Sequence, residues 1–346
     1  MEFIEKIAIV SENGPTQKRK NHSKKGAVIA LSSIPLIMTL GNSMLIPVLP
    51  MMENEMNISS FQTSLIITVY SIVAILLIPV AGFISDHIGR KKVIIPSLII
   101  AAIGGLVSSW AAWKIKDPYW IILLGRTLQG IGAAGAAPIV MPLIGDMFKD
   151  EEEVSASLGM IETSNTFGKV LSPILGAYLA SIIWFLPFLA FPAFCLIAIV
   201  LMAFLVKTKH MEFEPIPFKQ FRQKIKEIFR ENGRWLLAAF FIGTVLMFVL
   251  FAVLFYLSEI LETDYGMYHV KKGLLLAIPL GALCVFSLLT GKIIKENKVL
   301  MKWITFASLL LLAVSIATLS FSKKLPFILS AFFLSGVGIG ASLPCL

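Results

Sequence analysis

Three charged side chains, Arg126, Glu162 and Lys169, lie inside long apolar stretches of this sequence. A charge in such a setting is expensive unless it is paired or faces water, and residues of this kind often move ions or bind substrates. Glu162 and Lys169 are seven residues apart and would share one face of a helix. We expect that face to line a cavity or the interior of the helix bundle, where Glu162 could exchange a proton and Lys169 could hold a negatively charged group.

A simpler alternative exists for two of these residues. Arg126 is only seven residues into its apolar stretch, so its side chain could extend to the membrane interface. Glu162 could stand close enough to the end of its helix to be wetted by solvent. Both alternatives stay open at the level of the sequence, whereas Lys169 is deeper in its stretch.

A second concentration of charge is the segment GFISDHIGRKK, residues 82–92, between two apolar stretches. Gly82 would allow a neighbouring helix to approach, and Gly89 would allow a sharp reversal of the chain. Asp86, at a helix end, could pair with a base or face the N-terminus of another helix. The three bases of the turn are Arg90, Lys91 and Lys92. We expect these residues, with Asp146 at the end of a later stretch, to form a conformational latch that holds one state of a moving protein. The simpler interpretation, an orientation signal with an incidental Asp86, explains the bases but not the glycines.

The composition places these charges in a membrane protein. The 346 residues are 57% hydrophobic and 15% charged, and the mean hydropathy is +0.85. Soluble domains are closer to one quarter charged. The net charge of +9 resides mostly in short segments between apolar stretches, so we expect it to orient the chain in a membrane and expect no nucleic acid as a partner.

Other sites receive no support from the sequence. The three cysteines, Cys195, Cys284 and Cys345, lie far apart inside apolar stretches, without the spacing of a metal site or a disulfide framework. We therefore expect no metal and no cofactor. A phosphate-binding loop of the GxxxxGK[ST] kind does not occur, which argues against ATP as the energy source.

Ten stretches are long and apolar enough to cross a bilayer, which takes about 20 residues. They are residues 27–50, 61–84, 93–113, 119–145, 155–180, 183–206, 235–258, 272–291, 300–320 and 325–346. Of the 30 lysines and arginines, 22 lie on the side of the N-terminus and six on the other side. Because basic loops stay in the cytoplasm, we predict a multi-pass protein of the cytoplasmic membrane with a cytoplasmic N-terminus.

The stretches divide into two groups. Residues 207–234 form the longest connection and carry large apolar residues at helical spacing among bases, which predicts an amphipathic helix on the inner leaflet. The expected units are a tail, a six-helix bundle, a linker and a four-helix bundle, at residues 1–26, 27–206, 207–234 and 235–346.

A weak internal repeat relates the two groups. GIGAAGAAP at residues 130–138 resembles GVGIGASLP at residues 336–344, 206 positions later. Pro118 and Pro326, and Gly82 and Gly291, recur at nearly the same offset. A parallel repeat of six helices is an arrangement of two-bundle transporters. The repeat predicts twelve spans, of which this sequence has ten, so we expect a sequence truncated after its tenth span.

The segment at 82–92 resembles the signature between the second and third helices of the major facilitator superfamily, with His87 in place of the usual Arg or Lys. The resemblance implies an all-α integral membrane fold of two six-helix bundles that rock about a central cavity. Two further segments resemble motifs of its proton-coupled drug exporters. One contains Arg126, Gln129 and Gly130 and is associated with proton transfer. The other, the antiporter motif of the fifth helix, contains Gly168, Ser172, Pro173 and Gly176, with Ser172 and Ala177 in place of glycines.

These features predict a transporter and not an enzyme. We expect export of small amphipathic compounds or drugs in exchange for protons, driven by the proton gradient, by a monomer in the lipid bilayer. Lys169 departs from the family pattern and argues against a purely cationic range of substrates. An importer or uniporter of a metabolite or sugar, and a lipid flippase, remain as alternatives.

Overall fold

The computed structural model describes residues 15–148, 150–206, 218–294, 298–321 and 324–345, which form helices and short turns. Ten long helices occur in these ranges. They are α2 (Pro15–Ser43), α4 (Ser60–Ile88), α5 (Arg90–Lys114), α6 (Tyr119–Met147), α7 (Glu151–Ile182), α8 (Leu186–Leu205), α9 (Phe218–Thr263), α10 (His269–Ile294), α11 (Lys298–Thr318) and α12 (Leu325–Ser342). Each contains one of the ten stretches predicted from the sequence or most of one.

The first stretch differs from the prediction. Helix α2 ends at Ser43, and the chain continues through a 3-10 turn, Ile46–Val48, into the short helix α3, Leu49–Met56. Pro47 and Pro50 stand in the first turns of these two elements. Proline lacks a backbone N–H and fits the first turn of a helix but not its interior. The predicted single span at 27–50 is therefore interrupted after Ser43, at the end that leads into α3.

Local sequence explains where several helices begin and end. Ser59 and Gln62 form a reciprocal capping box at the start of α4. Helix α7 starts after Asp150, whose side chain accepts a hydrogen bond from the backbone N–H of Glu152 at 3.3 Å. Three glutamates follow in the first turn, where the helix dipole favours negative charge. One of them, Glu153, pairs with Lys24 at 2.7 Å and fastens α7 to α2.

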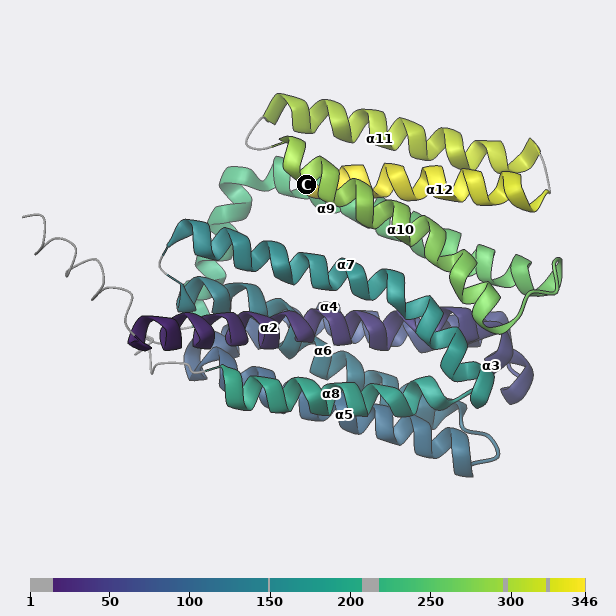
Figure 1. Cartoon of the computed structure of the whole chain (residues 1–346), viewed down its shortest axis with the longest axis horizontal. Coiled ribbons are helices and arrows are strands. Elements are labelled where there is room, and N and C mark those ends of the chain that lie inside the picture. Colours follow the sequence, from purple (N-terminus) through teal and green to yellow (C-terminus); the bar gives the residue numbers. More distant parts are fainter. Residues whose placement is uncertain (1–14, 149, 207–217, 295–297, 322–323, 346) are drawn as a thin grey trace, which may run out of the picture.

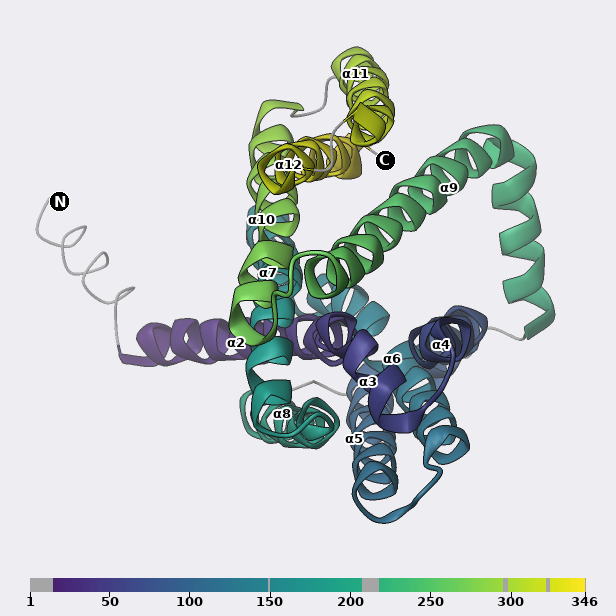
Figure 2. The same cartoon turned by 90° about the vertical axis from the view of Figure 1, so that its right-hand side faces the viewer.

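Helices α2 and α4–α8 form one bundle, and α9–α12 lie beside it (Figures 1 and 2). Two buried clusters show where the two groups meet. One cluster contains residues between 27 and 206 only. The other joins α3 and its neighbours to α9, α10 and α12, through residues such as Leu49, Met52, Leu254 and Leu257. The two groups of helices therefore pack together mainly at the α3 end of the molecule.

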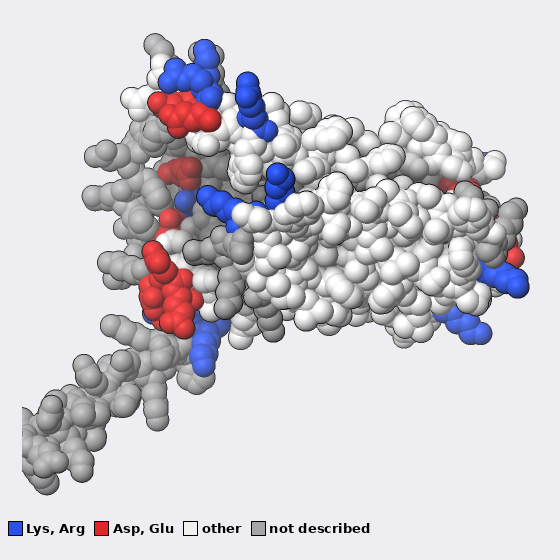
Figure 3. Space-filling view, turned by 90° about the horizontal axis from the view of Figure 1, so that it is seen from above, with Lys and Arg blue, Asp and Glu red and all other residues white. Residues whose placement is uncertain are grey.

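Nine helical segments of the described chain are long and apolar enough to cross a membrane. Figure 3 shows Lys, Arg, Asp and Glu gathered toward the two ends of the visible face, with a broad uncharged band between them. Helix α7 is not among the nine. It carries Glu162, Asn165 and Lys169 and packs between α2 and α10. A helix shielded by neighbours tolerates polar residues that a lipid-facing helix does not.

The predicted repeat has a counterpart in the packing. Gly130 of α6 lies against the backbone of α4, and Gly336 of α12 lies against the backbone of α10. Two residues further on, Gly132 faces α5 and Gly338 faces α11. A Cβ at any of these four positions would come within 3.0 Å of a neighbouring atom. Glycines 206 positions apart thus make the same helix contacts, as a parallel repeat requires.

The predicted linker overlaps α9. This helix already begins at Phe218 and runs to Thr263, and Figure 2 shows it turning a corner along its length. Residues 207–217 lie outside the described part of the chain. The limits at 206 and 235, and the location of the amphipathic segment on the inner leaflet, stay predictions.

Candidate functional site

The turn between α4 and α5 has the geometry that its glycine and charges predict. Gly89 adopts φ of 100°, in the region that favours glycine, and ends α4 while starting α5. The guanidinium of Arg90 pairs with Asp86 at 3.2 Å and donates from Nε to Asp146 of α6. Arg90 therefore links both acids of the expected latch.

The remaining residues of the latch have different surroundings. The ammonium of Lys91 donates to the carbonyls of Ala203 at 3.1 Å and Val206 at 2.5 Å, at the C-terminus of α8. Cations stabilise this end of a helix, where carbonyls lack partners. Lys92 is exposed. At Gly82 the expected close helix contact is not present, because no described atom lies within 4 Å of the position of a Cβ.

Arg126 lies in the interior of the first bundle and is 0% exposed. Its Nε donates to the carbonyl of Ile66 at 2.8 Å, Nη2 donates to Oδ1 of Asn42 at 2.6 Å, and Nη1 donates to Oε1 of Gln129. The guanidinium also stands 4.6 Å from the centre of the Tyr70 ring. These contacts exclude the alternative in which Arg126 extends to the interface.

Gln129 and Gly130 belong to the same arrangement. Gln129 is buried beside Arg126 as its hydrogen-bond partner. Gly130 brings the backbone of α6 against Tyr70, where a Cβ would stand 2.6 Å from the Tyr70 carbonyl oxygen. The close approach of α6 to α4 is what allows Arg126 to reach the carbonyl of Ile66.

The segment of α7 from Gly168 to Gly176 packs closely against α2. A Cβ at Gly168 would stand 3.1 Å from the carbonyl oxygen of Leu36, and a Cβ at Gly176 would overlap the backbone of Met44. Ser172 is fully buried, and its hydroxyl donates to the carbonyl of Lys169 at 2.9 Å. Pro173 is also buried, and its carbonyl oxygen lies against Gly273 of α10. The small residues of this motif let two helices approach each other.

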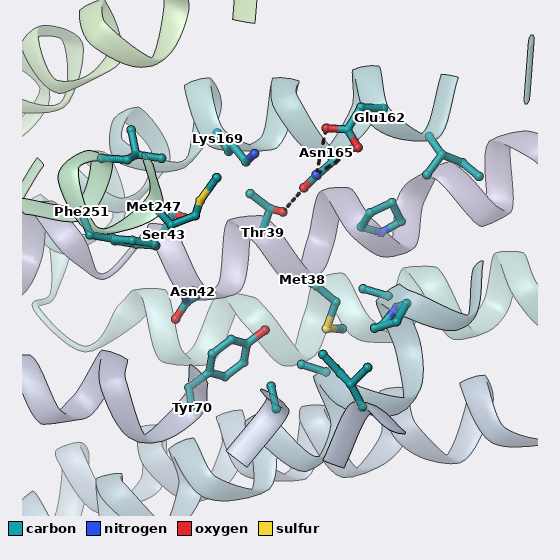
Figure 4. A pocket seen from close by; sticks show the side chains of 18 of the residues that line it. Met38, Thr39, Asn42, Ser43, Tyr70, Glu162, Asn165, Lys169, Met247 and Phe251 are labelled. Atoms are coloured by element: carbon teal, nitrogen blue, oxygen red, sulfur yellow. Dashed lines mark hydrogen bonds between the residues drawn. The ribbon is translucent and has the colours of Figure 1, made fainter. Parts of the chain in front are cut away.

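A cavity of about 410 Å³ lies between the two groups of helices. Helices α2, α4, α6, α7, α9 and α10 all contribute to its lining. Figure 4 shows Glu162, Asn165 and Lys169 in a row along α7, facing Thr39 of α2. Small-molecule sites in proteins have volumes of about 300–1,000 Å³, with few polar groups on an apolar wall.

The polar lining is organised around α7. The hydroxyl of Thr39 donates to Oδ1 of Asn165 at 2.5 Å, and the amide of Asn165 donates to the carboxylate of Glu162 at 3.4 Å and 3.5 Å. Lys169 lines the same cavity two turns further along the helix. The shared face expected for Glu162 and Lys169 is present, and both residues line the cavity.

Some residues of the site were not predicted from the sequence. Thr39, Asn42, Tyr70 and Asn165 line the cavity but are ordinary in type, and their proximity depends on how helices pack. Another feature that the sequence did not predict is the pair of Glu262 and Lys272. Lys272 is 2% exposed and donates to Glu262 at 2.6 Å. A charge near the end of a stretch gives no sign of whether a partner buries it.

Comparison with known proteins agrees with this arrangement. Residues 31–346 match the family described as Major Facilitator Superfamily. The chain is 54% identical over 320 residues to the bacillibactin exporter of Bacillus subtilis (strain 168), which covers 92% of this chain and 80% of the relative. It is 26% identical over 234 residues to multidrug resistance protein 2 of the same organism, which covers 68% of this chain and 56% of the relative.

A solved structure shows the same fold. A partially occluded, inward-open conformation of a xylose transporter from E. coli superimposes with a TM-score of 0.74, covers 93% of this chain and 85% of the other, and shares 13% identity. The family match covers most of the sequence, and the fold, the ten helices and the central cavity agree with it. The chain therefore belongs to the Major Facilitator Superfamily of membrane transporters.

Proposed function

We propose that the protein exports small amphipathic compounds across the cytoplasmic membrane in exchange for protons. The observation that carries this proposal is the cavity between the two groups of helices, with Glu162 on its wall and the antiporter motif on the same helix. The relatives named as an exporter and as a resistance protein support the direction of transport. The cycle would use the proton gradient as its energy source and would need one copy of the chain.

Glu162 is the proton carrier in this proposal. Its carboxylate faces the cavity and is held by hydrogen bonds from Asn165 that are longer than 3.3 Å, so a proton or a substrate donor can compete with them. Arg126 lies behind the cavity wall and fixes Asn42 and Tyr70 in place. Arg126 is thus a positioning residue that also supplies positive charge close to the cavity.

The orientation follows from the distribution of bases. We place the N-terminus and the turn between α4 and α5 in the cytoplasm, because 22 of the 30 bases lie on that side. The two groups of helices pack at the α3 end, so the described conformation would be closed to the outside.

Introduced cysteines test the orientation. A membrane-impermeant maleimide added to intact cells should label Asp264→Cys and should spare Glu227→Cys, both at exposed positions, and the reverse pattern would refute it.

Transport into inverted membrane vesicles tests the function. Vesicles that contain the protein should accumulate an exported dye when their interior is acidified, and a protonophore should stop the accumulation. Glu162→Gln should prevent gradient-driven accumulation while leaving the protein in the membrane. Accumulation of the dye without a gradient would favour a uniporter. Uptake of sugars by intact cells would favour an importer, and movement of labelled lipid between leaflets would favour a flippase.

Bacillibactin is a narrower candidate for the substrate, favoured by the 54% identity to an exporter of that compound. Expression of this chain in a Bacillus subtilis strain that lacks its own exporter would test it. Restored appearance of bacillibactin in the medium is the expected result. If the amount of bacillibactin in the medium equals that of the strain with an empty vector, bacillibactin is excluded as a substrate.

A further inference from the structure

Lys169, which is half-buried, differs from the other cations of the described chain that lie away from solvent. Arg90 pairs with two acids, Arg126 has three hydrogen-bond acceptors, and Lys272 pairs with Glu262. The ammonium of Lys169 has no hydrogen bond and no ion pair within the described residues, although it lines the cavity. An ammonium group removed from bulk water is unfavourable without an anion beside it.

The acid that shares the cavity with Lys169 forms no ion pair with it. The carboxylate of Glu162 accepts two long hydrogen bonds from Asn165, and the hydroxyl of Thr166 donates to the backbone carbonyl of Glu162 at 2.8 Å. Seven residues separate Glu162 from Lys169, which places their backbones about 10 Å apart along α7. The cavity therefore presents a negative and a positive group at two separate points of one wall.

A second source of positive potential lies behind the same cavity. Oδ1 of Asn42 accepts a hydrogen bond from Arg126, so the amide N–H groups of Asn42 face away from Arg126. Asn42 also lines the cavity. The partners of Arg126 are all uncharged, so its charge is not neutralised by a carboxylate among them. Asn42 thus offers hydrogen-bond donors to the cavity with a guanidinium directly behind it.

We propose that the compounds carried by this protein bear an acidic group that forms an ion pair with Lys169, and that Asn42 donates to the polar atoms nearby. This inference rests on the proposed export function and specifies the class of substrate. The apolar part of such a compound would lie on Met38, Met247 and Phe251, of which methionine adapts readily to different shapes.

Exchange with protons restricts the substrate further. An anion alone would bind best when Glu162 is protonated, because a second negative charge is repelled. Substrate and proton would then travel together and not in exchange. A hydrogen-bond donor on the substrate that faces Glu162 removes this conflict, because it competes with the proton for the same carboxylate. The substrate class is therefore an amphipathic compound with an acid that meets Lys169 and, at a second point, a donor such as an amine that meets Glu162.

Three fluorescent probes separate these requirements. Nα-dansyl-lysine carries both groups, dansylcadaverine is the same molecule without its carboxylate, and Nα-dansyl-norleucine lacks the amine. Fluorescence anisotropy would measure the binding of each probe to the purified full chain in nanodiscs of zwitterionic lipid. We expect Nα-dansyl-lysine to bind most tightly, by about tenfold or more over dansylcadaverine, because a charged hydrogen bond contributes on the order of 1.5–3 kcal/mol.

Variants assign the difference to Lys169. Lys169→Met should lower the affinity for Nα-dansyl-lysine to that for dansylcadaverine without weakening the binding of dansylcadaverine, which would show that the cavity is intact. Lys169→Arg should restore much of the affinity. Lys114→Met removes a lysine that stands over Trp113 outside the cavity and serves as the matched control for loss of one positive charge.

Several results would overturn the inference. These are equal affinity for Nα-dansyl-lysine and dansylcadaverine, failure of all three probes to bind, and the same loss of affinity in Lys114→Met as in Lys169→Met. If the difference disappears in nanodiscs of anionic phosphatidylglycerol, a lipid headgroup is the anion and the assignment to a soluble compound fails. Equilibrium binding needs no gradient, so its failure is distinguishable from failure of proton-driven export in vesicles.

Discussion

Arg126 is held by three hydrogen bonds that a shorter or less branched cation cannot reproduce. Lysine has the same charge but presents a point charge in place of a planar fork. We expect Arg126→Lys to lose at least one of these bonds and to leave Asn42 free to rotate. Proton-driven export should fall to a few per cent or less, because about 2 kcal/mol or more of positioning is lost.

Purified protein would show a modest decrease in melting temperature for this variant, and vesicle assays would show the loss of export. Lys114→Arg, the reverse exchange at an exposed site, is the control. Normal export by Arg126→Lys would mean that only the charge at this position matters.

Asp86 is half-exposed and shares Arg90 with Asp146. An exposed ion pair contributes only about 0–1 kcal/mol, so Asp86→Asn should leave expression and melting temperature almost unchanged. Turnover should nevertheless fall several-fold, because the latch depends on the charge and not on the size of this side chain. Export by matched amounts of both proteins in vesicles is the measurement. Unchanged turnover would reduce the turn to an orientation signal.

For single residues, the sequence predicted burial correctly where a charged residue stands inside a long apolar stretch. Arg126 and Lys169 stand inside apolar stretches, and the structure places both in the interior or at the cavity. The sequence could not predict the partners. Asn42 and Arg126 are 84 positions apart and meet only because α2 and α6 pack in one bundle. The burial of Lys272 was not predicted, because Lys272 stands three residues after the start of α10, at a helix end that Glu262 covers.

The contact between α7 and α2 is close enough that a side chain larger than glycine does not fit at Gly176. Gly176→Ala would place a methyl group against the backbone of Met44, which cannot move without displacing α2. We expect a loss of about 1–3 kcal/mol in stability, the usual cost of overpacking. Gly159→Ala in the same helix has open space around it and is the matched control. Thermal unfolding of the purified proteins should show a lower melting temperature for Gly176→Ala alone.

Helices themselves were predictable because hydrophobic length is a strong signal in a membrane protein. The break after Ser43 was missed because residues 44–50 are as apolar as the stretch before them, and only Pro47 and Pro50 indicate the interruption. Helix α7 was predicted as a span although its polar residues weaken the signal. Its place between α2 and α10 explains how a helix with Glu162 and Lys169 can lie inside the protein.

Because the two groups of helices pack together at the α3 end, residues buried there should be poorly accessible to reagents added outside the cell. Ser258 is 1% exposed, and its hydroxyl donates to the carbonyl of Ile46 at 3.2 Å across the two groups. We expect Ser258→Cys to react slowly with an impermeant maleimide added outside, and faster when transport opens this end. Asp264→Cys is the exposed control. Equal rates for the two positions in the absence of substrate would contradict the closed end.

Lys91 has a mechanical consequence for the whole molecule. Its ammonium holds the last carbonyls of α8, and Val206 is the final described residue before the connection to α9. The turn that carries Asp86 and Arg90 is thus tied to the point where the chain leaves the first bundle. A displacement of this turn would therefore carry the last residues of the first bundle with it, through the contacts of Lys91 with Ala203 and Val206.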